Sequence, residues 1–295
     1  MSDDHTHSLT MDAMRTPLTI AQAQHHARQL GVDRLDAQLL LCEAVQQGRA
    51  WLFAHDTDTL TPPQQTRFLS DLQRRAAGEP LAYIVGEKEF FGLTLQVSRD
   101  VLVPRPDTET LVEWALTLIP EQTPTTVLDL GTGSGAIALA IQHARPQAQV
   151  TAVDASEAAL RMALNNARVL RLPVQFLHGS WLQPVSNQRF DLIVSNPPYI
   201  AEGDPHMAAL GFEPKQALTS GPDGLDDLRQ IIAAAPVHLH PGGWLLLEHG
   251  WAQAEAVRAL MECAGFTAVQ SRRDLAGIER CTGGQWPGIA GYAGN

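Results

Sequence analysis

The sequence predicts an α/β protein in which a small helical domain precedes a doubly wound, mostly parallel sheet of seven strands. Two observations indicate this fold class. From residue 127 onward, short apolar runs alternate with segments of helical periodicity, which is the pattern of strands joined by helices in a parallel sheet. Before residue 80, apolar residues recur only at helical spacing.

The alternating region is expected to hold seven strands, at 127–130, 149–154, 174–177, 190–195, 243–248, 267–272 and 279–282. Helices are expected between them, at 136–144, 157–167, 225–235 and 252–264. Ser156 is suited to cap the second of these helices, and Gly265 ends the last one.

The segment before residue 80 divides into a polar tail at 1–16 and a helical domain at 17–80. We expect the tail to be disordered, since it lacks the apolar core of a signal peptide. Helices are expected at 18–30, 35–45 and 61–78. The pattern is equally consistent with a substrate-recognition domain and with a stabilising appendage.

Residues 81–103 are expected to form a β-hairpin linker, with strand-like residues at 83–85 and alternation from Leu93 to Val97. The final domain spans 104–295 and opens with the residues PRPDTE. Asp107 is expected to cap a helix at 108–118. Arg105 lies between two prolines, and this rigid placement indicates the wall of a site.

Composition excludes several function classes. The formal net charge is −11 and the pI about 5.4, which disfavours a protein that mainly holds a nucleic-acid backbone. The three cysteines have no metal-site or redox spacing, so we expect reduced thiols, no metal and a cytoplasmic location. No apolar run approaches the roughly 20 residues that span a bilayer. We expect a monomer that binds neither a membrane nor nucleic acid directly.

A glycine-rich turn follows the first strand in the stretch VLDLGTGSG, with Gly131, Gly133 and Gly135 at alternate positions. These glycines allow a ligand to approach the backbone at a helix start, although such a turn alone is a weak signal. Asp154 ends the second strand, where a ribose would lie, or else it caps the next helix. Asp129 could reach a cationic amino group. Together they favour S-adenosylmethionine over a dinucleotide.

The residues Asn196-Pro197-Pro198-Tyr199 end the fourth strand and give the sharpest signal. Proline has no backbone donor, so the Asn196 side-chain oxygen and nearby carbonyls remain as rigid acceptors. Such acceptors would orient a planar NH2 group, on which Tyr199 could stack. The alternative is a plain turn at the end of a strand.

These motifs resemble those of class I S-adenosylmethionine-dependent methyltransferases, whose sheet is Rossmann-like. The leading helical domain, PRPDTE, NPPYI, FEP and LLLEHGW are similar to the release factor glutamine N5-methyltransferase family, from about residue 18 onward. The resemblance implies methylation of the glutamine in the Gly-Gly-Gln motif of peptide chain release factors. One departure from the family is Ser180, where the family commonly has Asp, so an adenine contact there would be weaker or made by backbone.

The resemblance also implies the roles of individual residues. Cofactor contacts are expected from Asp129, Gly131, Thr132, Gly133, Ser134, Gly135, Asp154, Trp181 and Asn196. Catalytic residues are expected to be Asn196, Pro197 and Tyr199, and substrate contacts those three with Pro198 and Arg105. An amide nitrogen is hardly basic, so no strong general base is required. His249 could be a base, but a structural histidine is the favoured interpretation.

Three alternatives stay open from sequence. A nucleic-acid amino-methyltransferase, acting on adenine N6 or guanine N2, uses the same Asn-Pro-Pro-Tyr corner. A non-catalytic cofactor-binding or ribosome-assembly module would have the same turn without chemistry. A dehydrogenase would bind NAD on the glycine-rich turn.

Overall fold

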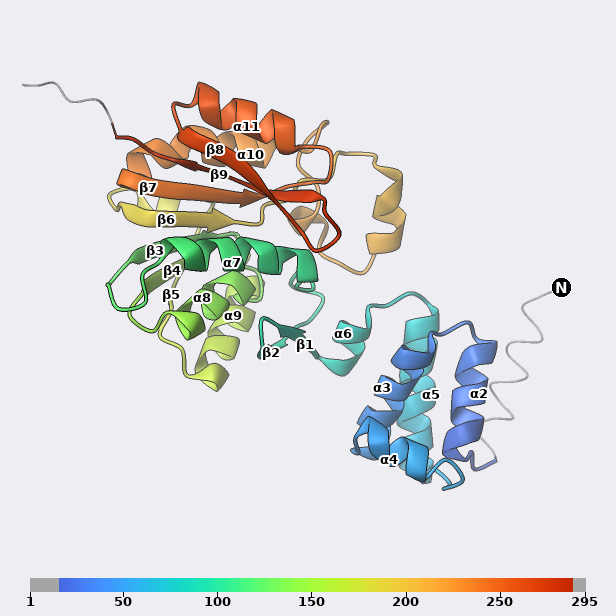
Figure 1. Ribbon diagram of the computed structural model, residues 1–295. Coiled ribbons are helices and arrows are strands. Elements are labelled where there is room, and N and C mark those ends of the chain that lie inside the picture. The colour runs from blue at the N-terminus through green and yellow to red at the C-terminus, as the bar shows by residue number, and fades with distance from the viewer. Residues whose placement is uncertain (1–15, 289–295) are drawn as a thin grey trace, which may run out of the picture. The chain divides into compact units, whose positions relative to one another are not determined.

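The computed structural model describes residues 16–288, so the interpretation of residues 1–15 as a disordered tail lies outside the described residues. The chain divides after Gly86 into two compact units (Figure 1). The first is helical, and the second holds the large sheet.

The first unit contains α2 (Ile20–Gln29), α3 (Arg34–Val45), α4 (Arg49–Ala54), α5 (Pro62–Ala76) and α6 (Leu81–Val85). The helices expected at 18–30, 35–45 and 61–78 are confirmed as α2, α3 and α5. Capping boxes at Thr19 and Thr61 start two of them. Helix α4 was not expected, because six residues are too few to show a helical period.

The strand expected at 83–85 is wrong. These residues lie in α6, which contacts α3 and α5. Apolar side chains of α6, including Ile84 and Val85, pack on the core of the helical unit. β-Branched residues favour strands only weakly, and burial against two helices outweighs that preference here. Gly86, with φ of 88°, ends α6 in the left-handed conformation.

The second unit begins with the antiparallel hairpin β1 (Glu87–Phe90) and β2 (Leu93–Gln96). Its large sheet contains β3 (Thr126–Leu130), β4 (Gln149–Asp154), β5 (Gln175–His178), β6 (Phe190–Ser195), β7 (Leu239–Glu248), β8 (Thr267–Arg273) and β9 (Glu279–Gln285). The strand order is β5-β4-β3-β6-β7-β9-β8, with β9 antiparallel to both neighbours and the other pairs parallel. The predicted seven-stranded, mostly parallel sheet is confirmed.

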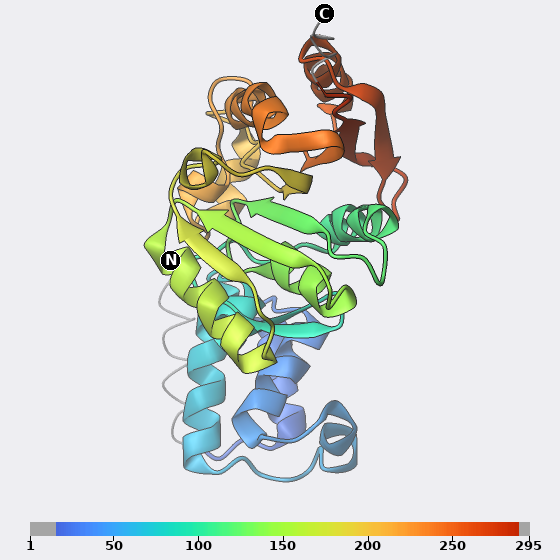
Figure 2. The same ribbon diagram turned by 90° about the vertical axis from the view of Figure 1, so that its left-hand side faces the viewer.

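Helices cover both faces of this sheet (Figures 1 and 2). On one face lie α7 (Glu109–Leu118), α8 (Ala136–Ala144) and α9 (Glu157–Leu170). On the other lie α10 (Asp226–Ala234) and α11 (Ala254–Cys263). Each face has its own apolar cluster, so the central strands are buried on both sides, as their mostly apolar sequences require.

Two strands are longer than the sequence predicted, because the prediction treated their glycines as strand ends. Strand β7 begins at Leu239 instead of residue 243, and β9 ends at Gln285 instead of residue 282. In β9, a Cβ on Gly283 would lie 2.7 Å from the Trp114 ring. Glycine there leaves room for the Trp114 ring of α7 against the sheet, although in a sequence pattern glycine indicates a turn.

Asp107 does not cap α7, so that prediction is wrong. Pro106–Thr108 form a 3-10 turn, and α7 starts at Glu109 without a side-chain cap. The Asp107 carboxylate lies 3.3 Å from the Arg280 Nε on β9. The early turn at Pro106 directs Asp107 toward that guanidinium, and the ion pair joins the helix start to the sheet.

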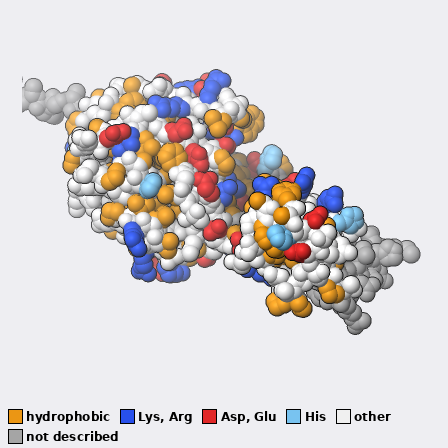
Figure 3. All heavy atoms as spheres, turned by 60° about the horizontal axis from the view of Figure 1, so that its bottom comes forward, with side chains coloured by type: hydrophobic (Ala, Val, Ile, Leu, Met, Phe, Trp, Pro, Cys, Tyr) orange, Lys and Arg blue, Asp and Glu red, His pale blue; other side chains and the backbone are white. Residues whose placement is uncertain are grey.

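Charged side chains on the larger unit are mixed. On the face drawn in Figure 3, its Lys and Arg side chains lie in separate groups among Asp and Glu side chains. Within residues 16–288, no helix has both the length and the apolarity needed to cross a bilayer.

Candidate functional site

The glycine-rich turn and the Asn-Pro-Pro-Tyr corner lie side by side. Strands β3 and β6 are parallel neighbours, with Leu130 opposite Ser195. The Ser195 hydroxyl donates to the Leu130 carbonyl at 2.7 Å and joins the two strand ends. The strand order reverses between these two strands, which is where open α/β sheets bind ligands.

A pocket opens over the ends of β3, β4 and β6. The expected cofactor residues that line it are Gly131, Thr132, Gly133, Ser134, Asp154, Trp181 and Asn196. Ala136 and Ile137, at the start of α8, complete the wall beside the turn. Backbone N–H groups at a helix start and an acid at the end of β4 therefore face one space.

Asp154 fixes the turn as well as lining the pocket. Its carboxylate accepts hydrogen bonds from the Gly133 N–H and the Ser156 N–H, each at 2.8 Å. Burial raises its pKa, and the two backbone bonds oppose that shift. The cap of α9 is Ser156, and Asp154 bonds to the backbone of that residue. Asp154 also borders the pocket, and its contact with a ribose stays a prediction.

Two of the expected cofactor residues do not line the pocket. Asp129 is fully buried, and its Oδ2 accepts from the Thr132 hydroxyl at 2.6 Å and the Ala138 N–H at 3.2 Å. Burial raises its pKa to about 7. A Cβ on Gly135 would lie 3.2 Å from Ala163, so this glycine serves helix packing. Neither residue is placed for direct contact with a ligand in this pocket; both shape the turn from beneath.

Trp181 lines the pocket directly beside the glycine-rich turn. A Cβ on Gly131 would lie 3.3 Å from its ring. The indole Nε1 donates to Asp227 Oδ1 at 3.2 Å, and Asp227 also lines the pocket. The flat ring is thus held in place by α10, at a distance from Gly131 that leaves no room for a larger side chain at that position.

Asn196 lines this pocket and also a second one. The second pocket includes Pro197 and Tyr199 of the corner, with Leu102, Ile200, Leu210 and Leu218 around them. Pro198 lines the first pocket. The Asn196 Nδ2 donates to the Thr108 hydroxyl at 3.1 Å, away from solvent. The corner therefore has one side chain that borders both spaces.

Arg105 lines both pockets too, in keeping with its expected place in a site wall. Its guanidinium forms an ion pair with Glu213, a buried residue of the FEP segment. The other oxygen of Glu213 accepts the Val103 N–H at 3.2 Å. Glu213 thus fastens the segment PRPDTE beside the corner and neutralises Arg105.

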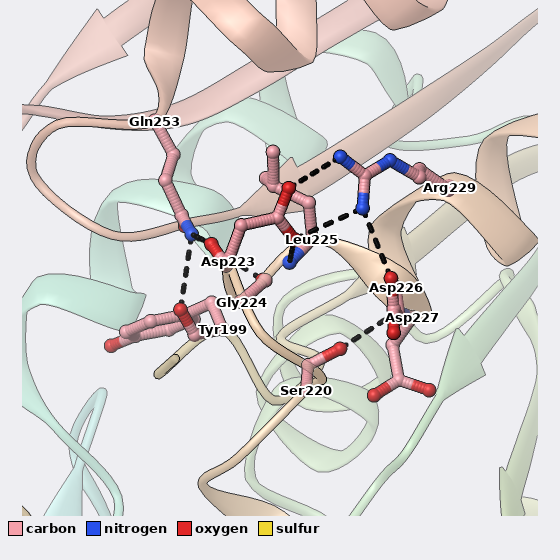
Figure 4. Close-up of polar contacts among 9 residues, drawn as sticks. All are labelled: Tyr199, Ser220, Asp223, Gly224, Leu225, Asp226, Asp227, Arg229 and Gln253. Atoms are coloured by element: carbon pink, nitrogen blue, oxygen red, sulfur yellow. Dashed lines mark hydrogen bonds and ion pairs between the residues drawn. The ribbon is translucent and has the colours of Figure 1, made fainter. Parts of the chain in front are cut away.

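A hydrogen-bond cluster holds the outer end of the corner (Figure 4). The Gln253 Nε2 donates to the Tyr199 carbonyl at 3.1 Å and lies 3.3 Å from the carbonyls of Asp223 and Gly224. Its Oε1 accepts the Gly250 N–H at 2.8 Å. Gln253 therefore ties the corner to the turn that precedes α10.

His249 does not face either pocket. It is buried, with Nε2 2.8 Å from the Thr282 hydroxyl and Nδ1 3.0 Å from the Gly250 carbonyl. Burial lowers its pKa. These contacts support the structural interpretation of this histidine rather than a role as base.

Comparison with known proteins identifies the family. Residues 18–86 match the PrmC N-terminal domain, and residues 108–221 match the methyltransferase small domain. The release factor glutamine methyltransferase of Bordetella pertussis is 51% identical over 257 residues, covering 86% of this chain and 95% of that protein. The chain belongs to the release factor glutamine methyltransferase family. It is an enzyme that uses S-adenosylmethionine.

Further relatives agree with this assignment. The release factor glutamine methyltransferase of Salmonella typhimurium is 46% identical, covering 90% of this chain and 96% of its own. A methyltransferase structure from Pyrococcus furiosus is similar with a TM-score of 0.54 at 21% identity, covering 74% of this chain and 100% of that one. At that identity the structural likeness establishes the methyltransferase fold alone.

The first pocket fits the cofactor of this family. A fixed glycine turn, an acid at the end of β4 and the Trp181 ring match the needs of a phosphate-free nucleoside. No described residue in the wall is a Lys, and its Arg105 is neutralised by Glu213. This lining suits a cationic ligand better than a pyrophosphate.

Replacing Asp154 by Asn is expected to weaken S-adenosylmethionine binding about 10- to 100-fold, because hydrogen bonds to a charged group contribute about 1.5 to 3 kcal/mol. Asparagine has one acceptor oxygen in place of two, so it cannot hold Gly133 and Ser156 and also accept from a ligand. Calorimetric titration with the cofactor measures the change. The control is Glu157→Gln on the exposed start of α9, and equal affinity in both variants would contradict the role of Asp154.

Several residues of the site have no clear signal in the sequence. Glu213 lies in the FEP segment, which is similar to the family but to which the resemblance assigns no role. Asp227 and Gln253 look like ordinary surface residues of helix starts. Glu248 has one usable signal, an acid at the end of an apolar strand, which is the same signal that draws attention to Asp154.

Proposed function

We propose that the protein transfers the methyl group of S-adenosylmethionine to the side-chain amide nitrogen, N5, of the glutamine in the Gly-Gly-Gln motif of peptide chain release factors. One observation carries this proposal: Asn196 borders both the cofactor-type pocket and the second pocket. A planar NH2 group bound in the second pocket would meet Asn196 at the boundary. Membership of the family supplies the substrate class.

The second pocket supports a glutamine side chain. Leu102, Ile200, Leu210 and Leu218 offer apolar contact to its methylene groups. Pro197 and Pro198 have no N–H, so at these two positions the backbone offers only carbonyl acceptors. The Asn196 Oδ1 and a corner carbonyl can each accept one N–H of the substrate amide, which orients the nitrogen and raises its electron density.

The bound cofactor supplies an electrophilic methyl group on a sulfonium. The residues of the chain supply position and electrostatics, since an amide nitrogen needs no strong base before attack. Burial raises the pKa of Tyr199, so its hydroxyl stays protonated at neutral pH. His249 faces away from the pockets. The proton of the methylated amide leaves to water.

The helical unit, matched over residues 18–86, is proposed to contribute to release factor recognition.

We further propose that the enzyme is a monomer in the cytoplasm, where release factors act. Light scattering of the purified protein measures the first point. Fractionation of cells that produce the protein measures the second.

The deciding experiment offers radiolabelled S-adenosylmethionine with three substrates: a release factor, the same factor with its Gly-Gly-Gln glutamine replaced by Ala, and a mixture of DNA and ribosomal RNA. We expect label only in the unaltered release factor. Label confined to nucleic acid would favour the alternative amino-methyltransferase. A protein that binds cofactor and labels none of the three would be a non-catalytic module.

A further inference from the structure

Glu248 lies directly behind the Asn-Pro-Pro-Tyr corner without lining either pocket. It is the last residue of β7, and its neighbour Leu247 pairs with Ser195, the residue before Asn196. On its other side it pairs with Cys281 of β9. Its side chain is 1% exposed, so the carboxyl group is inside the protein and requires a reason to be there.

The contacts of Glu248 lead to Asn196. The carboxylate lies close enough to the Thr108 hydroxyl and the Asn196 amide for these two donors to oppose the rise in its pKa, while its Oε2 has no hydrogen-bond partner among the described residues. The Asn196 Nδ2 also donates to the Thr108 Oγ1, at 3.1 Å. The Asn196 Nδ2 is therefore directed inward, toward Thr108 and Glu248. The Asn196 Oδ1, on the opposite side of the planar group, is left for the pockets.

We propose that Glu248 is a positioning residue: together with Thr108 it fixes the orientation of the Asn196 amide, so that Oδ1 faces the substrate nitrogen. A carboxylate only accepts hydrogen bonds, so a rotated Asn196 amide would set its oxygen against another acceptor. Thr108 favours the same orientation of the Asn196 amide: when its hydroxyl hydrogen points at Glu248, its oxygen can only accept a hydrogen bond from the Asn196 Nδ2. This inference rests on the proposed function, in which Asn196 accepts from the substrate.

Charged and titratable groups surround Glu248 from three sides. Asp107 precedes Thr108, Arg280 and Cys281 lie on β9, and Tyr199 follows the corner. Burial raises the pKa of Glu248 to about 7; Asp107 adds to the shift, and the Thr108 bond, Arg280 and the Asn196 bond oppose it. Protonated Glu248 would become a donor and would no longer enforce one amide orientation. Activity should therefore rise with pH near 7.

The test compares two pairs of variants in the full-length enzyme with release factor as substrate. Glu248→Gln keeps the shape and removes the acceptor-only character, and its control is Glu279→Gln, which lies in an ion pair with Arg258 outside the site. Thr108→Val removes the hydroxyl, and its control is Thr108→Ser, which keeps it. We expect kcat to fall about 10- to 100-fold in Glu248→Gln and Thr108→Val, the loss of one hydrogen bond to a charged group.

Three readouts separate positioning from a loss of folding. The KM for release factor should stay within about threefold of the parent value in both variants, since neither residue lines the second pocket and Asn196 remains present. The Kd for S-adenosylmethionine should stay within about threefold of the parent value in Glu248→Gln, since Glu248, unlike Thr108, does not line the first pocket. The melting temperature of Glu248→Gln at pH 8 should not fall, because the variant removes a buried charge. The rise of kcat with pH near 7 should disappear in Glu248→Gln and persist in Glu279→Gln.

Parental kcat and an unchanged pH profile in Glu248→Gln would overturn the positioning role. So would a loss of kcat that matches a loss of folded protein. Failure of the proposed function has a different outcome: the parent enzyme itself would not methylate the release factor glutamine. An active parent matched by Glu248→Gln therefore rejects only the role of Glu248.

Discussion

Replacement of Asn196 by Ala should lower kcat for release factor methylation about 10²- to 10³-fold, the cost of removing one preorganised hydrogen-bonding group that acts in a transition state. The side chain borders both pockets, and its amide is held by Thr108. Alanine leaves the substrate NH2 without its acceptor, so the nitrogen is neither oriented nor polarised. Steady-state kinetics at saturating cofactor give the measurement.

The matched control for this variant is Asn165→Ala on α9. That residue donates to the Gln96 Oε1 at 2.6 Å and lines neither pocket. We expect the control to retain parental kcat, and cofactor affinity to change little in either variant. If Asn196→Ala kept kcat within about threefold of the parent, the corner could not be the site of the catalytic hydrogen bond.

The second large effect is expected from Gly224→Ala. Gly224 has φ of 75°, and a Cβ there would lie 2.2 Å from the Tyr199 carbonyl oxygen and 2.8 Å from the Gln253 Nε2 (Figure 4). The clash would displace the outer end of the corner. We expect a loss of about 2 to 5 kcal/mol in unfolding free energy, from left-handed strain of about 1 to 2 and overpacking of about 1 to 3 kcal/mol.

Gly203→Ala isolates the cost of left-handed backbone strain from the cost of overpacking. Gly203 has φ of 83°, but a Cβ added there would have no atom within 4 Å apart from its chain neighbours, so only the backbone strain applies. Denaturant unfolding of both variants measures the difference, and methylation kinetics should show a lower kcat in Gly224→Ala alone. Equal stability and equal kcat in the two variants would mean that the turn before α10 does not support the corner.

Local sequence patterns predicted most of the sheet correctly. Strands β4 and β6 and helix α8 have the expected bounds, because each combines an apolar core-facing pattern with a clear stop. The errors lie where packing overrides local preference: the strand expected at 83–85, the cap expected at Asp107, and the glycines of β7 and β9. In each case the deciding contact comes from another element.

The sequence by itself determined the fold class, the two motifs and their place at neighbouring strand ends, because these depend on short patterns that a parallel sheet brings to one edge. Only the tertiary structure decided which side chains hold those motifs in place. Thr108 meets Asn196 across 88 positions in the chain, and Glu213 meets Val103 across 110. Such contacts leave no periodic trace, since a single polar residue gains a partner only when distant elements pack together.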